Sequence, residues 1–271
     1  MKSFLVNAFR IFKGKHPQHK GKLFLALIKL YFLQGMSRNS SPVFIKYGSK
    51  KINGDNYASL DYVFKEIFIG EEYRVELENE RPVIFDCGAN VGCATIYFKE
   101  RYPTAQIYCF EPQPKAYGLL QKNIQENKLD TKSYNMALSN RPGTLEFFIP
   151  IEGVGFSASI NSKRESGQTI TVDTTLLSAY TKQHAVIDLV KIDVEGAEFQ
   201  LMEDLVQSGE LSSGKILNFV IEYHHRIGNE PSRLAEFLHI FENAGYDYHI
   251  KSFLDPFHVH QDILLYIKRR P

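Results

Sequence analysis

The most constraining feature of this 271-residue chain is an alternation, from residue 83 onward, of short apolar runs with amphipathic segments of helical period. The expected strands lie at 83–85, 107–110, 133–137, 187–192, 216–221, 246–250 and 263–267. The expected helices between them lie at 94–100, 116–124, 197–206 and 234–241. Continuous apolar strands that alternate with helices are typical of a parallel sheet covered on both faces. We therefore expect an α/β fold.

Two regions depart from this alternation and define the expected domain organisation. Residues 1–59 are expected to form a basic helical extension, with helices near 4–12 and 23–33, and residues 60–271 to form the main domain. Within the main domain, residues 143–180 contain hairpin-like sequence and a stretch rich in Gly and Ser. We interpret that segment as an insertion into the alternating pattern.

The formal net charge of +1 hides a strong asymmetry along the chain. Residues 1–51 contain 11 Lys or Arg and no Asp or Glu, so the remainder holds 21 basic and 31 acidic residues, a balance of −10. A basic amphipathic arm on an acidic domain is compatible with two arrangements. The arm either binds an anionic membrane surface or packs on the domain as a helical cap with solvated lysines.

Several other classes of protein are disfavoured. The most apolar stretch, 23–33, is interrupted by Lys29 and is too short to span a bilayer. Three cysteines without metal-ligand spacing indicate reduced, buried thiols and a cytoplasmic protein, peripheral at the inner membrane face if the arm binds lipid. Nucleic acid is not an expected partner, because the main domain is acidic and would repel phosphates.

Polar residues stand where the expected strands end, and ligands of open α/β sheets bind at that edge. Asp86 begins the turn Asp-Cys-Gly-Ala-Asn-Val-Gly, in which Gly88 and Gly92 let a ligand approach the backbone. The G-x-x-x-G spacing lacks the third glycine of a dinucleotide fingerprint and the Lys of a P-loop. Glu111 ends the next strand, where a carboxylate can accept both hydroxyl hydrogens of a ribose. S-adenosylmethionine, which has a ribose but no pyrophosphate, fits this layout.

The segments IFDCGANVG, CFEPQP, NMALSN, LVKIDVEGAEFQLM and FVIEYH resemble, in order and spacing, those of the FkbM-type methyltransferases over residues 60–267. The resemblance implies a class I methyltransferase (Rossmann-like) sheet of seven strands with the last antiparallel. It also implies O-methylation of sugar hydroxyls in glycans, glycolipids or natural products, with S-adenosylmethionine as cofactor. By this resemblance the methionine part is surrounded by Asp86, Gly88, Asn90 and Gly92, the ribose by Glu111, and the adenine by Met136 and Ala137.

Methyl transfer to a sugar hydroxyl needs an aligned acceptor and a group that manages its proton. Asp193 follows the fourth strand, and Glu222 and His224 share a face if the fifth strand continues that far. Either His224 or Asp193 serves as general base with Glu222 orienting it, or the three bind a hard cation such as Mg²⁺. Expected substrate contacts come from Glu195 and, in the insertion, from Ser157 and Ser159. Glu198 is expected only to complement the helix dipole.

Two other functions remain open at the level of sequence. A nicotinamide-dependent oxidoreductase would use the same type of sheet, although the missing third glycine disfavours it. A non-catalytic member of the methyltransferase fold would keep the cofactor site and lack the chemistry.

Overall fold

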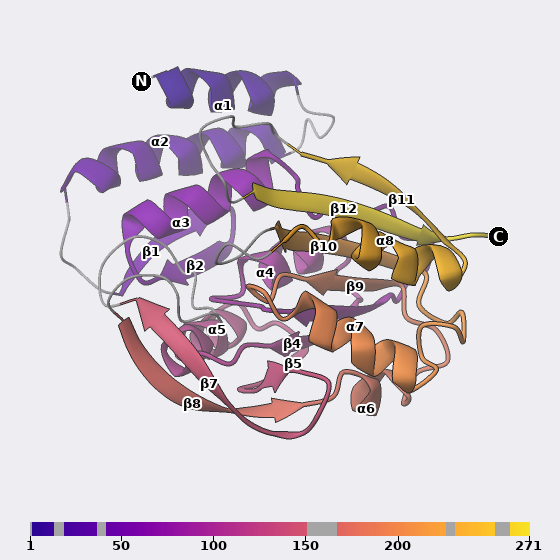
Figure 1. Ribbon diagram of the computed structural model, residues 1–271. Coiled ribbons are helices and arrows are strands. Elements are labelled where there is room, and N and C mark those ends of the chain that lie inside the picture. Colours follow the sequence, from indigo (N-terminus) through magenta and orange to yellow (C-terminus); the bar gives the residue numbers. More distant parts are fainter. Residues whose placement is uncertain (1, 14–18, 37–41, 151–166, 226–230, 253–260) are drawn as a thin grey trace.

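The structure, a computed structural model, describes residues 2–13, 19–36, 42–150, 167–225, 231–252 and 261–271 (Figure 1). Its central sheet has the strand order β11-β12-β10-β9-β3-β4-β5. These strands are β3 (Val83–Cys87), β4 (Gln106–Phe110), β5 (Thr131–Tyr134), β9 (Leu189–Ile192), β10 (Asn218–His225), β11 (Tyr246–Lys251) and β12 (Gln261–Arg269). Only β12 runs antiparallel to its neighbours in this sheet. The expected seven strands with an antiparallel last strand are therefore confirmed.

Both faces of this sheet are covered, which explains why its strands are apolar throughout. Ile84 packs with α4 (Cys93–Arg101) and α5 (Pro114–Glu126) in one hydrophobic cluster. The adjacent Phe85 points the other way and packs with α7 (Glu198–Gln207) and α8 (Leu234–Asn243). Successive side chains of a strand face opposite sides, so each strand contributes to two cores. The expectation of a doubly covered parallel sheet is met.

The N-terminal segment joins the first of these cores. It contains α1 (Lys2–Lys13), α2 (Lys20–Met36), a hairpin of β1 (Val43–Tyr47) and β2 (Lys50–Gly54), α3 (Tyr57–Phe64) and a π-helical turn at Lys65–Ile69. The two helices expected within residues 1–59 are present, and the β1–β2 hairpin, which was not expected, also lies in that range. Leu27 and Leu30 of α2 are fully buried, and they pack in the same cluster as Ile84.

The hairpin is attached to α5 by side-chain amides. The backbone N–H of Asn53 donates to Asn123 Oδ1 at 2.8 Å, and Asn123 Nδ2 donates back to the carbonyl of Asn53 at 2.9 Å. Asn127 makes the same reciprocal pair with the backbone of Lys51. Asn123 also donates to the carbonyl of Val91 at 2.7 Å, so one buried amide ties the hairpin to the glycine-containing turn after β3.

The insertion, together with β6 (Ala137–Leu138) before it, forms a second, three-stranded sheet of order β6-β8-β7, in which β7 is Gly143–Pro150 and β8 is Gly167–Thr175. The antiparallel β7–β8 pair confirms the expected hairpin. Ala137, expected to end the third strand of the main sheet, belongs to β6 instead. Ser157 and Ser159 lie outside the described residues. The short helix α6 (Ser178–Thr181) follows β8.

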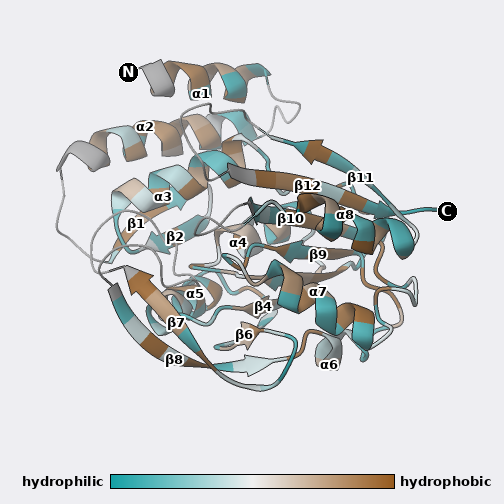
Figure 2. Cartoon of the chain, viewed as in Figure 1, coloured by the Kyte–Doolittle hydropathy of each residue, from teal (hydrophilic) through white to brown (hydrophobic). Residues whose placement is uncertain are grey.

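Hydropathy along the described chain agrees with this packing (Figure 2). The three cysteines are buried free thiols, as expected. Among the described helices, none combines the length and apolar character that a membrane crossing requires. Figure 2 also shows strongly hydrophobic residues on α1 and α2, at the outer edge of the molecule.

Candidate active site

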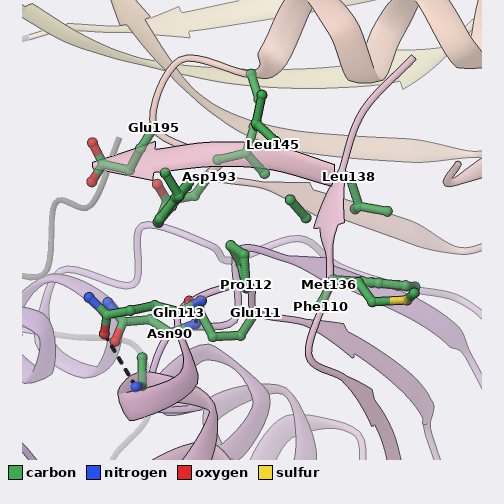
Figure 3. Close-up of a pocket in the computed structure, with 16 residues that line it drawn as sticks. Asn90, Phe110, Glu111, Pro112, Gln113, Met136, Leu138, Leu145, Asp193 and Glu195 are labelled. Carbon is green, nitrogen blue, oxygen red and sulfur yellow. Dashed lines mark hydrogen bonds between the residues drawn. The ribbon is translucent and has the colours of Figure 1, made fainter. Parts of the chain in front are cut away.

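A cavity opens at the carboxyl ends of β3, β4 and β9, with about 670 Å³ of space free of atoms when the open solvent at its mouth is included. The turn after β3, the segment after β4, the second sheet and the segment after β9 all contribute to its wall (Figure 3). It lies where ligands of open α/β sheets bind. The predicted site residues that line it are Gly88, Asn90, Glu111, Met136, Ala137, Asp193 and Glu195.

Gly88 is required by a close approach of two strand ends. Its φ is +78°, and a Cβ built on it would lie 1.7 Å from the carbonyl oxygen of Asp193. Its N–H donates to the carbonyl of Phe110 at 3.0 Å. Only glycine fits such a position, because any side chain would overlap backbone atoms. The glycine is therefore explained by the close packing of the two strand ends, and the contact of a ligand with its backbone stays a prediction.

Glu111 is held in place by two backbone donors. The N–H of Asn90 donates to its Oε2 and the N–H of Gln113 to its Oε1, each at 2.8 Å. Burial raises the pKa of Glu111 to about 7, although the two backbone donors lower it. Each oxygen keeps a further lone pair for a ligand hydroxyl. This arrangement fits the predicted ribose contact.

Apolar side chains form a further part of the cavity wall. Met136 and Ala137, the predicted adenine contacts, line it together with Leu138 of β6 and with Leu145 and Phe147 of β7. The two β7 residues were not predicted, because the expected contacts from the insertion were Ser157 and Ser159 in its Gly/Ser-rich part, not residues of its hairpin. An apolar wall of this kind suits a flat heteroaromatic ring.

Asp86 does not line the cavity, contrary to the direct contact expected for it. Its carboxylate is fully buried, accepts a hydrogen bond from Thr95 Oγ1 at 2.7 Å, and lies 3.3 Å from Lys191 Nζ. Lys191 is 2% exposed, donates to the carbonyl of Gly88 at 2.7 Å and lies 3.4 Å from Asp193 Oδ2. Asp86 thus sits behind the wall and holds the lysine that supports Gly88 and Asp193.

Gly92 also lies outside the cavity wall. Its φ is +87° at the start of α4, and a Cβ there would lie 2.7 Å from Leu120 Cδ1 of α5. The second glycine of the motif therefore allows the two helices to pack closely, which corrects its predicted contact with the methionine part of a cofactor.

Asp193, Glu195 and His224 come together beside the cavity. His224 Nε2 lies 3.4 Å from Glu195 Oε2 and 3.9 Å from Asp193 Oδ1. His224 Nδ1 lies 2.8 Å from Glu198 Oε1, and Glu198 is 2% exposed. Glu198 thus orients the imidazole from α7, and its expected role as a mere dipole partner was wrong.

Glu222 does not orient His224, although strand β10 does place both on one face. Glu222 Oε2 instead accepts a hydrogen bond from Tyr73 Oη at 3.1 Å, and the same hydroxyl lies 3.2 Å from Asp193 Oδ2. Burial, followed by the charges of Asp193 and Glu222, raises the pKa of Tyr73 well above 10. Tyr73 therefore remains a protonated donor that joins the two carboxylates.

The protonation state of His224 follows from its surroundings. Burial opposes the charged form, but the adjacent carboxylates, with Glu198 the strongest contributor, raise the pKa of His224 well above 6.5. An imidazolium donates hydrogen bonds and cannot take up another proton. This environment favours Asp193 over His224 as the proton acceptor.

Figure 3 shows how the two sets of polar residues lie relative to each other: Asp193 and Glu195 on one side of the cavity, and Asn90, Glu111 and Gln113 on the other. Glu111 and Asn90 can bind a neutral, hydroxyl-rich part of a ligand. Asp193 and Glu195 provide negative charge for a cationic part and for an acceptor proton. The cavity therefore fits a ligand with an aromatic base, a ribose and a positive centre.

Comparisons with known proteins agree with this geometry. A sequence model of the methyltransferase FkbM domain matches residues 86–248, which is more than half of the chain. Methyltransferase sdnD of Sordaria araneosa is 29% identical over 219 residues, which cover 69% of this chain and 82% of that protein. 2-O-methyltransferase NoeI of Sinorhizobium fredii is 30% identical over 165 residues, covering 54% of this chain and 65% of that protein.

The solved structure of methyltransferase FkbM from Methylobacillus flagellatus superposes with a TM-score of 0.46 at 13% identity, covering 91% of this chain and 60% of that chain. The domain match covers the glycine turn, Glu111 and the Asp193 cluster, and it ends within β11. The chain belongs to the FkbM methyltransferase family and is an S-adenosylmethionine-dependent methyltransferase.

Proposed function

We propose that this enzyme methylates a hydroxyl oxygen of a sugar in a glycan, glycolipid or natural-product precursor. The carrying observation is the Asp193 carboxylate, which lines the cavity and is fixed by Tyr73 and Lys191. A neutral hydroxyl must lose its proton as it gains a methyl group, so the site needs an acceptor of this kind. NoeI, a relative at 30% identity, is named a 2-O-methyltransferase.

The three parts of S-adenosylmethionine can each be assigned to a different part of the cavity wall. Gly88 and Asn90 would contact the methionine part, Glu111 would accept hydrogen bonds from the ribose, and Met136 and Ala137 would contact the adenine. When bound, S-adenosylmethionine supplies a methyl group on a positively charged sulfur. In Figure 3, Asp193 and Glu195 lie across the cavity from Asn90 and Glu111, and we expect a substrate hydroxyl to approach these two carboxylates.

Asp193 acts as the proton acceptor in this proposal. Tyr73 and Lys191 fix its Oδ2 through contacts at 3.2 and 3.4 Å, so Oδ1, which also lies 3.9 Å from His224 Nε2, is the oxygen that would accept the substrate proton. Glu195 accepts a second hydrogen bond from the substrate, and the His224 imidazolium holds the two carboxylates together. Preorganised charges of this kind do not need to reorient during the reaction.

The same side chains also fit a divalent cation. Ligand atoms of Asp193, Glu195 and His224 lie within 4.8 Å of one another, and Glu198 on Nδ1 would fix a neutral imidazole with Nε2 toward the ion. Oxygen-rich sets with one imidazole suit Mg²⁺ or Mn²⁺, which would lower the pKa of a substrate hydroxyl. Activity that survives chelator treatment supports the Asp193 base, whereas activity that returns only with added Mg²⁺ or Mn²⁺ supports the cation.

The proposal is tested by transfer of labelled methyl groups from S-adenosylmethionine to a set of sugar acceptors. We expect the wild type and Asp173→Asn, which alters an exposed acid of β8, to methylate the same acceptor. Asp193→Asn should retain S-adenosylhomocysteine binding and lose turnover by about 100-fold or more. Full activity in Asp193→Asn, or methylation confined to nitrogen or carbon, would contradict the proposal.

Because the chain belongs to the FkbM methyltransferase family, the alternative function of a nicotinamide-dependent oxidoreductase no longer applies. A member that binds cofactor without turning over would give S-adenosylhomocysteine binding with no methylated product from any acceptor, and the same transfer assay detects that outcome.

A further inference from the structure

The outer face of α1 exposes a continuous apolar stripe. Leu5, Phe9 and Phe12 are 61%, 59% and 58% exposed, and their spacing of four and three residues places them on one side of the helix. Arg10 and Lys13 are exposed beside them, and Lys13 Nζ lies over the Phe9 ring at 4.8 Å. Apolar residues flanked by basic ones are typical of helices that lie on anionic lipid.

The exposed stripe is separate from the side of α1 that packs against the domain. The opposite side of α1 already packs inward, where Ile11 is 3% exposed and Asn7 is 6% exposed. Phe4 contacts Tyr31 of α2 with ring centroids 5.0 Å apart. The helix therefore has a buried inner side and, in addition, a strongly apolar outer side.

The exposed face of α2 has the same composition. Lys22, Leu25, Lys29 and Phe32 recur at spacings of three, four and three residues, and all four are exposed. Leu25 and Phe32 are 61% and 64% exposed, while Leu27 and Leu30 on the inner side are fully buried. Two consecutive helices thus present basic and large apolar side chains together, at the outer edge of the molecule (Figures 1 and 2).

The charge distribution along the chain favours an anionic lipid surface as the partner of this face. Residues 1–51 hold 11 basic and no acidic residues, while the remainder of the chain has a balance of −10. A second copy of this face would be repelled by its own charge. An anionic bilayer attracts the lysines and arginines and takes up Leu, Phe and Tyr side chains at the level of the headgroups.

We propose that the outer faces of α1 and α2 dock on an anionic lipid surface, with Leu5, Phe9, Phe12, Leu25 and Phe32 entering the interface. Docking of this kind is independent of the acceptor and of methyl transfer. It would hold the catalytic domain beside lipid-linked acceptors, while the acidic remainder of the chain would face away from the membrane.

The test is co-sedimentation of the full-length protein with vesicles of phosphatidylcholine alone or with added phosphatidylglycerol. We expect retention on the anionic vesicles only, and release at about 1 M salt, where screening reduces the range of the charges to about 3 Å. Leu5→Ser/Phe9→Ser/Phe12→Ser and Lys22→Glu/Lys29→Glu should each weaken retention by about tenfold or more.

Matched controls alter exposed residues of the main domain. Val186→Ser/Val206→Ser removes exposed apolar surface, and Lys128→Glu/Lys182→Glu makes the same change of charge elsewhere. Both should bind as the wild type does, and thermal unfolding checks that each variant is folded. Equal retention on both vesicle types, or wild-type retention by both arm variants, would overturn the proposal. A dimer that the triple serine variant converts to a monomer would assign the face to a second copy instead.

Discussion

Cofactor affinity should depend on pH through Glu111. Both of its carboxylate oxygens already accept a backbone hydrogen bond, and ribose hydroxyls would donate to the remaining lone pairs. Only the ionised form offers acceptors on both oxygens. Burial raises the pKa of Glu111 to about 7, so a bound ribose favours proton loss from a group that is half protonated at neutral pH.

The expected magnitude follows from that pKa. With a pKa of about 7, the ionised fraction is roughly 0.9 at pH 8 and roughly 0.1 at pH 6. If only the ionised form binds, the Kd should rise about tenfold between pH 8 and pH 6, or about 1.4 kcal/mol of binding free energy. Affinity is therefore lost as the pH falls, and it levels off above the pKa.

Isothermal titration calorimetry with S-adenosylhomocysteine at a series of pH values measures this dependence without turnover. Glu111→Gln should bind weakly at every pH, because it cannot ionise and presents one acceptor oxygen instead of two. Glu146→Gln on β7 is the control, because Glu146 is exposed on the strand that carries Leu145 and Phe147. A wild-type Kd that is the same at pH 6 and pH 8, or an unchanged pH dependence in Glu111→Gln, would refute the reasoning.

Three further substitutions test the supports of the site. Gly88→Ala should abolish S-adenosylhomocysteine binding, because its Cβ would overlap the carbonyl of Asp193. The control is Gly118→Ala on α5, whose Cβ would meet no atom within 4 Å. Thermal unfolding should show that this control variant is more stable than the wild type by up to about 1 kcal/mol. Lys191→Met should lower the free energy of unfolding by about 3–5 kcal/mol, because it leaves Asp86 as a buried charge without its cation, and chemical denaturation measures the loss. Tyr73→Phe should lower kcat by about tenfold or more while the Kd for S-adenosylhomocysteine stays unchanged, because it removes only the hydroxyl that joins Asp193 and Glu222. A proportional loss of affinity in Tyr73→Phe would place the tyrosine in the cofactor site instead.

The sequence was sufficient for the central sheet because its strands are buried on both faces. Such strands read as continuous apolar runs, and the polar residues at their ends mark the edge where the site forms. Glu111 and Asp193 were found in this way, and both line the cavity. The β1–β2 hairpin was missed because it is short and carries three lysines, Lys46, Lys50 and Lys51, which do not indicate a strand.

The residues that support the site could not be predicted from the sequence alone. Lys191 lies inside the apolar run of β9, and its role appears only when Asp86 and Gly88 are seen on the neighbouring strand. Tyr73 stands in a polar connecting segment, 120 positions before Asp193. Neither residue carries a local signal, because its function depends on what packs against it.

Strand periodicity specifies which face a side chain occupies and leaves its partner undetermined. Glu222 and His224 do share a face of β10, yet each is held by a different element: Glu222 by Tyr73, and His224 by Glu198 of α7. The partner follows from which element covers the strand at that level. Because α7 begins directly after the tight turn at Gly196, its first residue reaches the imidazole while Asp193 and Glu195 remain at the cavity. The length of that turn therefore separates the carboxylate that positions His224 from the carboxylates that face the substrate.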